Sequence, residues 1–194
     1  MITVIYPGSF DPVHLGHVSL ADYVSRLPQV DEVWFLPSRR NPFKQHEVRA
    51  ADQHRLEMLR LAVEGHHALK VHDLEFHLPY PSYTVNTLRE LIKRYPERRF
   101  RLLIGSDNWE KFDRWREAQT ILTDFGVLIY PRKGSAVTME LPANVSLLTD
   151  APHFPFSSTE VRQRLAQGGD VSTIINARVE EYTAVLWQRH HPVC

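Results

Sequence analysis

The chain has 194 residues, of which 43% are apolar and 24% are charged, a composition typical of a globular protein with one substantial core. Its 23 basic and 23 acidic residues balance, which excludes binding to nucleic acid or to anionic membranes through overall charge. The only cysteine, Cys194, excludes an internal disulfide framework and a cysteine-based zinc site. We therefore expect one cytoplasmic domain, residues 1–194, with no membrane or nucleic-acid partner, that binds anions at a local site.

Short β-rich runs alternate with amphipathic segments over most of the chain. The runs are bounded by Pro, Gly or polar clusters and predict strands at residues 2–6, 32–36, 69–74, 100–104 and 126–130. Apolar residues recur at helical spacing in three segments that link these strands, at residues 20–27, 50–63 and 84–95. This alternation predicts an α/β fold with right-handed crossovers and a doubly wound parallel sheet.

The C-terminal part predicts a small helical appendage to this sheet. A capped helix begins near Ser157, a glycine pair breaks it, and a second apolar-periodic stretch covers residues 174–187. The aromatic residues of that stretch, Tyr182 and Trp187, are compatible with a homo-oligomer interface and equally with a cover for the sheet. In such sheets ligands bind beyond the carboxyl ends of the strands, where the strand order reverses. We therefore expect the site at the loops after the first and fourth strands.

The loop after the first strand contains two glycines and two histidines in the sequence GSFDPVHLGH, residues 8–17, and runs directly into a helix. A helix N-terminus offers unpaired N–H groups and a partial positive charge, which predicts phosphate binding. His14 and His17 are three residues apart, so both rings are expected on one side of the helix. There they can donate hydrogen bonds to phosphate oxygens as pyrophosphate leaves. The motif alone is equally compatible with a capping and a solvent-facing histidine, or with half of a metal site.

A second motif, FSSTEVR at residues 156–162, opens a late helix. Ser157 or Ser158 can cap this helix, which is a sufficient structural explanation for the serines. The same hydroxyls and free N–H groups also suit a triphosphate, and Arg162 can direct its guanidinium group to the β- or γ-phosphate. We expect the two motifs to converge on a single triphosphate.

These two motifs resemble the HxGH nucleotidyltransferases, the superfamily of adenylyl- and cytidylyltransferases. Within it the chain is most similar to bacterial nicotinate-nucleotide adenylyltransferases, through the stretches PSYTVNTL at residues 81–88, IGSDN at 104–108, and the tryptophan pair at 109 and 115 followed by Arg-Glu. The resemblance implies a Rossmann-like nucleotidyltransferase fold. It also implies transfer of the adenylyl group of ATP, with Mg²⁺, to nicotinate mononucleotide, giving nicotinate adenine dinucleotide and pyrophosphate in NAD biosynthesis.

The resemblance further implies a role for each matching residue, with no metal site made by the protein alone. The residues implied in catalysis are His14, His17, Lys44 and Arg162. The residues implied in ATP binding are Gly8, Ser9, Phe10, Gly105, Asp107, Ser157, Ser158 and Thr159. The residues implied in acceptor binding are Tyr83, Thr84, Trp115 and Arg132. Taken alone, the same side chains are typical of simpler roles: a helix N-cap for Asp107, core packing for both tryptophans and a surface position for Lys44.

Three positions depart from the family pattern. Tyr6-Pro7 precedes Gly8 where a glycine is more usual, Phe43 replaces a histidine, and Asn86 replaces an aspartate. The stretch YPGSFDP is closer to phosphopantetheine adenylyltransferase, which performs the same chemistry on another acceptor but is shorter and lacks PSYTVNTL and the tryptophan pair. A non-catalytic nucleotide-binding module on the same fold is the alternative from another class. The sequence leaves open whether nicotinate or nicotinamide mononucleotide is preferred.

Overall fold

Six parallel strands form the centre of the molecule and place β1 beside β4. The computed structural model describes residues 1–39, 50–135, 137 and 140–190. Its strands are β1 (Ile2–Gly8), β2 (Glu32–Pro37), β3 (Leu69–Val71), β4 (Arg99–Gly105), β5 (Val127–Tyr130) and β6 (Val145–Leu147). The sheet order is β3-β2-β1-β4-β5-β6 and every pairing is parallel. The strand order therefore reverses between β1 and β4, which confirms the predicted doubly wound sheet.

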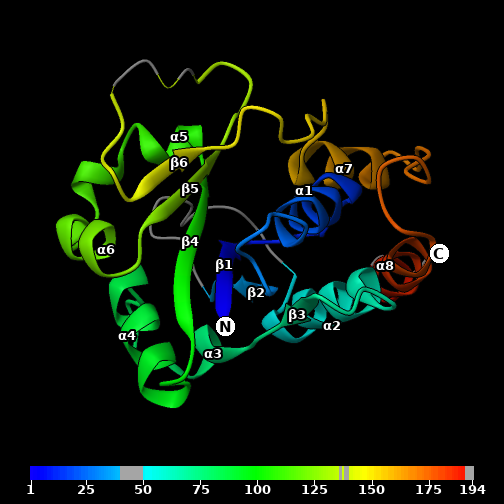
Figure 1. The fold of residues 1–194 in the computed structure, drawn as a ribbon. Helices are drawn as coiled ribbons and strands as arrows, with labels where there is room; N and C mark the ends of the chain where they lie inside the picture. The colour runs from blue at the N-terminus through cyan, green and yellow to red at the C-terminus, as the bar shows by residue number, and fades with distance from the viewer. Residues whose placement is uncertain (40–49, 136, 138–139, 191–194) are drawn as a thin grey trace.

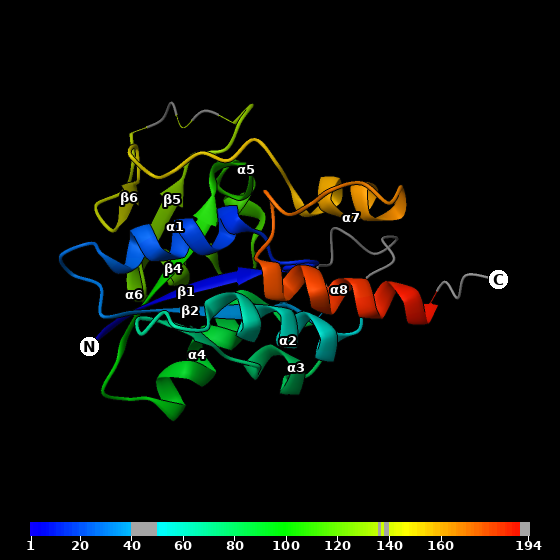
Figure 2. The ribbon, with the colours of Figure 1, turned by 90° about the vertical axis from the view of Figure 1, so that its right-hand side faces the viewer.

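Helices cover both faces of the sheet, as Figures 1 and 2 show. They are α1 (Leu15–Ser25), α2 (Asp52–Val63), α3 (Leu74–His77), α4 (Thr84–Arg94), α5 (Ser106–Trp109), η1 (Phe112–Arg114, a 3₁₀ turn), α6 (Ala118–Asp124), α7 (Ser158–Ala166) and α8 (Ala177–His190). Helices α1, α2 and α8 lie on one face, and α4 and α6 lie on the other (Figure 1). Each face of the sheet thus has its own hydrophobic core.

Alternate residues of each strand enter the two cores. In β1, Val4 and Tyr6 pack in the core under α1 and α2, whereas Ile5 packs in the core under α4. In β2, Phe35 enters the first core and Leu36 the second. Because both faces are covered, these strands are continuous apolar runs instead of alternating apolar and polar residues.

The structure corrects several predicted boundaries. The predicted strand at 69–74 ends at Val71, because the buried side chain of Leu74 opens α3 instead of extending the strand. The predicted helix at 174–187 begins at Ala177, because Ile174 and Ile175 are buried in the turn before it. Strand β6 and the short elements α5, η1 and α6 are absent from the prediction, since none exceeds 7 residues.

The predicted C-terminal appendage is present and packs on the first core. Its helix α8 lies against α2, where the Tyr182 hydroxyl is 2.9 Å from Nδ1 of His54. Tyr182 therefore contributes to the cover of this face. Within the described part of the chain, no helix has both the length and the apolar character that a membrane span requires.

Candidate active site

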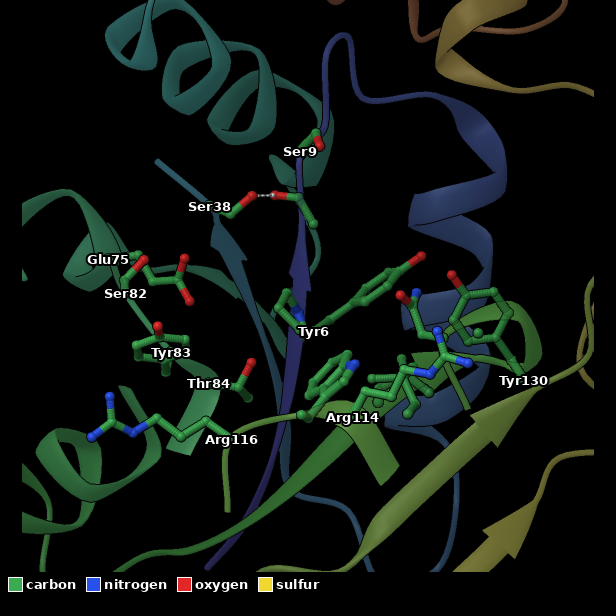
Figure 3. A pocket seen from close by; sticks show the side chains of 17 residues that line it. Tyr6, Ser9, Ser38, Glu75, Ser82, Tyr83, Thr84, Arg114, Arg116 and Tyr130 are labelled. Atoms are coloured by element: carbon green, nitrogen blue, oxygen red, sulfur yellow. Dashed lines mark hydrogen bonds between the residues drawn. The ribbon is translucent and has the colours of Figure 1, made fainter. Parts of the chain in front are cut away.

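A cavity of about 220 Å³ opens at the carboxyl ends of β1 and β4, where the strand order reverses (Figure 3). The end of β1 and the following turn line it with Gly8 and Ser9, and the end of β4 lines it with Gly105. The start of α4 contributes Tyr83 and Thr84. Trp115, from the segment after η1, is exposed to the same cavity. The structure thus brings together predicted ATP-binding and predicted acceptor-binding residues from distant parts of the chain.

The turn after β1 is held by hydrogen bonds to its main-chain carbonyls. Ser38, which follows β2, donates to the Gly8 carbonyl from its main-chain N–H at 2.8 Å and from its hydroxyl at 3.2 Å (Figure 3). Arg55 of α2 donates from Nη1 to the Ser9 carbonyl at 2.8 Å. With both carbonyls bound to the protein, the conformation of the turn is fixed.

The Phe10 ring supports this turn from below. Its side chain is 2% exposed and lies edge-on to the rings of Tyr6 and Phe35, with centroids 5.4 and 5.3 Å away. A Cβ at Gly8 would lie 2.8 Å from Cζ of Phe10, so this close approach requires glycine. The prediction assigns Phe10 to ATP binding, whereas the structure buries its ring away from the cavity. Phe10 is itself part of the turn, with a backbone φ of +47°.

His14 and His17 lie face to face at the start of α1, as the sequence predicts. Their ring centroids are 3.6 Å apart and the ring planes differ by 22°. His14 is the N-cap of α1, and Nδ1 of His17 accepts a hydrogen bond from the His14 main-chain N–H at 3.2 Å. An imidazole that accepts at Nδ1 carries its proton on Nε2 when it is neutral. His17 therefore combines a capping role with one N–H donor.

Both histidines are held in the neutral form. Burial lowers the pKa of His14 to about 4, and the positive charge of Arg132 acts in the same direction. Burial, the neighbouring His14 and Arg132 lower the pKa of His17. Nδ1 of His14 is buried and has no hydrogen-bond partner among the described residues. The pair therefore meets an anion with polar groups instead of a full positive charge.

The second motif meets the loop that leads to the histidines. The Ser158 hydroxyl donates to the Pro12 carbonyl at 2.9 Å across 146 residues of sequence. Arg162 donates from Nη1 to the Asp11 carbonyl at 2.5 Å, and the Phe156 ring lies edge-on to His14 at 5.4 Å. The two motifs therefore lie together, and Figures 1 and 2 show that α7 begins near the N-terminal end of α1. That they share one triphosphate stays a prediction, and none of His14, His17 and Arg162 is among the residues that line the cavity.

The two serines of this motif have different partners. Ser157 is the N-cap of α7 and accepts from the Glu160 N–H at 3.3 Å, so the structural interpretation of this serine is correct. Thr159 accepts a hydrogen bond from Nη2 of Arg162 at 3.3 Å. These contacts set the direction of the α7 N-terminus relative to the loop.

Asp107 and Arg132 form an ion pair above Gly105. Nη1 of Arg132 lies 3.0 Å from Oδ2 of Asp107, and a Cβ at Gly105 would lie 2.4 Å from Oδ1 of the same carboxylate. Oδ1 is buried and accepts no hydrogen bond from any residue that the structure describes. Gly105 is the N-cap of α5, so the alternative that Asp107 caps this helix is wrong. Arg132 is predicted among the acceptor residues, but the structure places it with Asp107 and close enough to His14 and His17 to lower their pKa.

The two tryptophans differ in their environment. Both rings pack on Phe112, with centroids 5.1 Å away for Trp109 and 5.3 Å for Trp115. Core packing therefore accounts for part of each ring, but Trp115 also lines the cavity. Lys44, predicted to bind a phosphate, lies outside the described residues.

The sequence predicts no role for four charged residues at the site: Arg55, Glu75, Arg114 and Arg116. A signal was available for Arg55, which shares the buried face of α2 with Leu59 and Ala62 at helical spacing. A charge on a buried stripe calls for an explanation. Here the Arg55 side chain is 1% exposed, and its Nη2 pairs with Asp52 at 2.5 Å. Glu75 and Arg114 lie outside the motifs and are recognisable only from the cavity. Arg116 follows Trp115 in the family stretch, but the stretch alone assigns it no role.

These geometries define the class of the protein. The described residues form a glycine turn, a pair of histidines and two helix starts that lie close together, which are the features of a nucleotidyltransferase. The family model described as Cytidylyltransferase-like matches residues 5–164. A protein of Bacteroides fragilis named "Probable nicotinate-nucleotide adenylyltransferase" is 46% identical over 187 residues, covering 96% of this chain and 92% of that protein. A protein of Bacteroides thetaiotaomicron with the same name is 45% identical over 93% of this chain and 89% of its own length. The chain belongs to the nicotinate-nucleotide adenylyltransferase family.

Solved structures support the fold. The Plasmodium falciparum nicotinic acid mononucleotide adenylyltransferase complexed with NaAD superimposes with a TM-score of 0.76 at 20% identity, covering 96% of each chain. A Vibrio parahaemolyticus structure described as a putative nicotinate-nucleotide adenylyltransferase gives a TM-score of 0.72 at 23% identity, covering 93% of this chain and 96% of that one. At these identities the likeness supports the Rossmann-like nucleotidyltransferase fold alone.

Replacing Arg55 with Met should destabilise the protein by about 3 kcal/mol, because it leaves the Ser9 carbonyl without its buried donor and removes the partner of Asp52. Urea denaturation measures this loss. Arg60→Met is the matched control, since Arg60 lies on the same helix with a 54% exposed side chain. If the two variants lose equal stability, Arg55 does not hold the turn.

Glu75 gives a prediction about pH. Its carboxyl group lines the cavity, is 5% exposed and accepts a hydrogen bond from the Thr87 hydroxyl at 3.2 Å. Burial raises the pKa of Glu75 from 4.5 to about 7. The folded state therefore keeps a proton that the unfolded state has lost, so this residue lowers the free energy of unfolding as pH rises from 4.5 through 7.

Glu75→Gln should remove this pH dependence. The gain in unfolding free energy of the variant over wild type should be roughly 3 kcal/mol larger at pH 8 than at pH 4.5. Urea titrations of both proteins at the two pH values test this. His14, whose lowered pKa acts in the opposite direction, is common to both proteins and cancels from the comparison. If the difference in unfolding free energy between the variant and wild type is the same at both pH values, the pKa of Glu75 is not raised by burial.

Proposed function

We propose that the protein transfers the adenylyl group of ATP to nicotinate mononucleotide, giving nicotinate adenine dinucleotide and pyrophosphate in NAD biosynthesis. The observation that carries this proposal is the shared cavity, which is lined by the nucleotide turn at Gly8 and Ser9 and by Tyr83, Thr84 and Trp115. Adenylyl transfer requires two nucleotides to meet end to end, and this cavity joins the two predicted halves. The names of the Bacteroides relatives support the same reaction.

On the nucleotide side, the start of α7 supplies N–H groups for the triphosphate. The start of α1 contributes its histidine pair, since the N–H groups of Leu15 and His17 already bind the carbonyls of Ile174 and His14. His17 donates from Nε2 to a phosphate oxygen, since its Nδ1 is occupied by the main-chain N–H of His14. Oδ1 of Asp107, which no described residue binds, accepts a ribose hydroxyl of the adenosine. Arg162 and Lys44 add positive charge along the triphosphate. Each of these roles agrees with the family resemblance.

On the acceptor side, Trp115 provides a flat face for the pyridinium ring. An indole attracts such a ring through dispersion and through cation–π interaction. The start of α4, with Tyr83 and Thr84, lines the cavity, and main-chain N–H groups at a helix start suit the ring carboxylate. The two ends of the cavity thus have different chemistry, which gives the substrates a fixed order.

In the reaction, a 5′-phosphate oxygen of the acceptor attacks the α-phosphorus of ATP in line. The new P–O bond forms as the bond to the bridging oxygen breaks, and pyrophosphate leaves with the electron pair. No covalent enzyme intermediate is required, because the protein contributes by orienting the reactants and by donating hydrogen bonds to the negative charge. His17 is placed to stabilise the charge that develops on the leaving group.

A divalent cation offsets the repulsion between the two polyanions, and we propose Mg²⁺ as this ion. Within the described residues no three His, Cys, Asp or Glu side chains are grouped to hold a metal. Mg²⁺ prefers phosphate oxygens and water and often binds through few protein ligands. The described side chains therefore suit a Mg²⁺ ion that enters the site already bound to the phosphates of ATP.

Pyrophosphate release with ATP and Mg²⁺ tests the proposal directly. The acceptors to compare are nicotinate mononucleotide, nicotinamide mononucleotide and phosphopantetheine, with the dinucleotide product identified by mass. We expect steady release with the pyridine nucleotides. Activity with phosphopantetheine alone would assign the rival adenylyltransferase, and no activity with any acceptor would favour a non-catalytic module.

His17→Ala should lower kcat by about 100-fold or more while changing the Kd for ATP by only a few-fold, since the Nε2 donor acts mainly in the transition state. Single-turnover rates and equilibrium ATP binding separate the two effects. His67→Ala, at an exposed position after α2, is the control for loss of an imidazole. Equal losses in turnover and in ATP binding would contradict a transition-state role.

A further inference from the structure

Charged side chains border the cavity around Trp115. Arg114 and Arg116 lie on either side of this residue in sequence, and both line the cavity. Glu75 is the only acid among the described residues of the lining. Figure 3 shows Arg116 on the same side of the cavity as Tyr83 and Glu75. The described lining as a whole therefore carries two arginines and one acid.

Arg116 is directed to this side of the cavity by its contacts. Its guanidinium carbon lies 4.8 Å from the centroid of the Tyr83 ring, an aromatic residue that itself lines the cavity. The next residue, Glu117, has a backbone φ of +53°, a conformation that few residues other than glycine adopt. This turn separates Arg116 from α6. A strained residue beside a cavity often marks a functional constraint.

Among the described residues, the charge of Arg116 is weakly compensated. Its ion pair is with Glu117, with Nε 4.0 Å from Oε1. That carboxylate is already bound by Arg89, which donates to Oε1 at 3.1 Å and to Oε2 at 2.6 Å. Glu75 adds less than a full negative charge at neutral pH, because burial raises its pKa to about 7.

A positive group beside the ring distinguishes the two pyridine mononucleotides. The ring of nicotinate is a zwitterion, with a pyridinium cation and a carboxylate, whereas the ring of nicotinamide has only the cation. A guanidinium group beside the ring attracts the carboxylate of the first and repels the net positive charge of the second. The ribose and phosphate are common to both, so a group that acts on the ring changes the ratio of their affinities.

We propose that Arg116 is a specificity-determining residue that makes the cavity prefer an acceptor mononucleotide whose ring bears a carboxylate. This inference rests on the proposed function, because it identifies which acceptor the same cavity selects. Arg116 has a side chain that is 57% exposed, so water weakens its effect and the selection is moderate instead of absolute.

The test is a series of substitutions assayed with both acceptors. We measure kcat/KM for nicotinate and for nicotinamide mononucleotide, with saturating ATP, in wild type, Arg116→Lys, Arg116→Gln and Arg116→Glu. The ratio of the two values should fall about fivefold in the Gln variant and further in the Glu variant. The Lys variant should stay close to wild type, because it keeps the charge. Lys93→Gln, at an exposed position of α4 outside the described lining, removes the same charge as a control and should leave the ratio unchanged.

Two results would overturn the proposal. A ratio that stays within about twofold of wild type in the Gln and Glu variants means that Arg116 does not select the ring. Equal losses with both acceptors mean that it holds the ribose or phosphate, which the two share. Thermal unfolding of each variant shows that the fold is retained.

Calorimetric binding of the two mononucleotides gives the same ratio without turnover. If wild type releases no pyrophosphate but still binds nicotinate mononucleotide more tightly in an Arg116-dependent way, the proposed function fails and the selectivity stands. If turnover is normal and the ratio does not depend on Arg116, only the present inference fails.

Discussion

The short main-chain segment between β1 and α1 constrains the rest of the site. Its carbonyls are bound by Ser38, by the buried Arg55 and by residues of α7, and the Phe10 ring fills the space beneath it. With its carbonyls turned to the protein, the segment can present N–H groups and the histidine pair to an anion. The position of the histidine pair, which we propose to be catalytic, therefore depends on contacts made by residues elsewhere in the fold. This is the arrangement expected where catalysis comes from preorganised polar groups.

Around the histidine pair, the proposed anion site has few uncompensated charges. His14 and His17 are neutral, and Arg132 is paired with Asp107, so its charge is partly offset before a ligand arrives. A cluster of free cations would bind pyrophosphate tightly and slow its release. In the proposed mechanism neutral donors at helix starts bind through geometry instead, and Arg162, Lys44 and the cation that accompanies ATP supply the opposite charge.

The sequence predicted the parts of the protein that depend on local pattern. The alternation of strands with helices was sufficient to predict the parallel sheet and to locate the cavity where the strand order reverses. The spacing of His14 and His17 was sufficient to predict that their rings lie on the same side of the helix. The family resemblance placed Tyr83, Thr84 and Trp115, which the structure brings to one cavity. Their roles in binding stay predictions.

The remaining features depend on tertiary contacts that leave no periodic signal. Phe10 belongs to a loop motif, yet its ring is buried because the Gly8 turn directs it inward. Arg132 follows β5, and only the packing of β4 against β5 shows that it meets Asp107 and not the acceptor residues. Boundaries failed where a single buried side chain decided them, as Leu74 did at the end of β3.

The two hydrophobic cores give the two substrates separate supports. Helices α1 and α7, which meet at the predicted phosphate site, pack with the first core, whereas α4 and the Trp115 segment pack with the second. The sheet lies between them, and β1 and β4 contribute residues to both. A change in one core can therefore move one substrate relative to the other while the contacts between the moved substrate and the protein are kept. Since in-line attack tolerates only small displacements of the reacting atoms, the proposed reaction depends on the packing of β1 against β4 as well as on the residues that line the cavity.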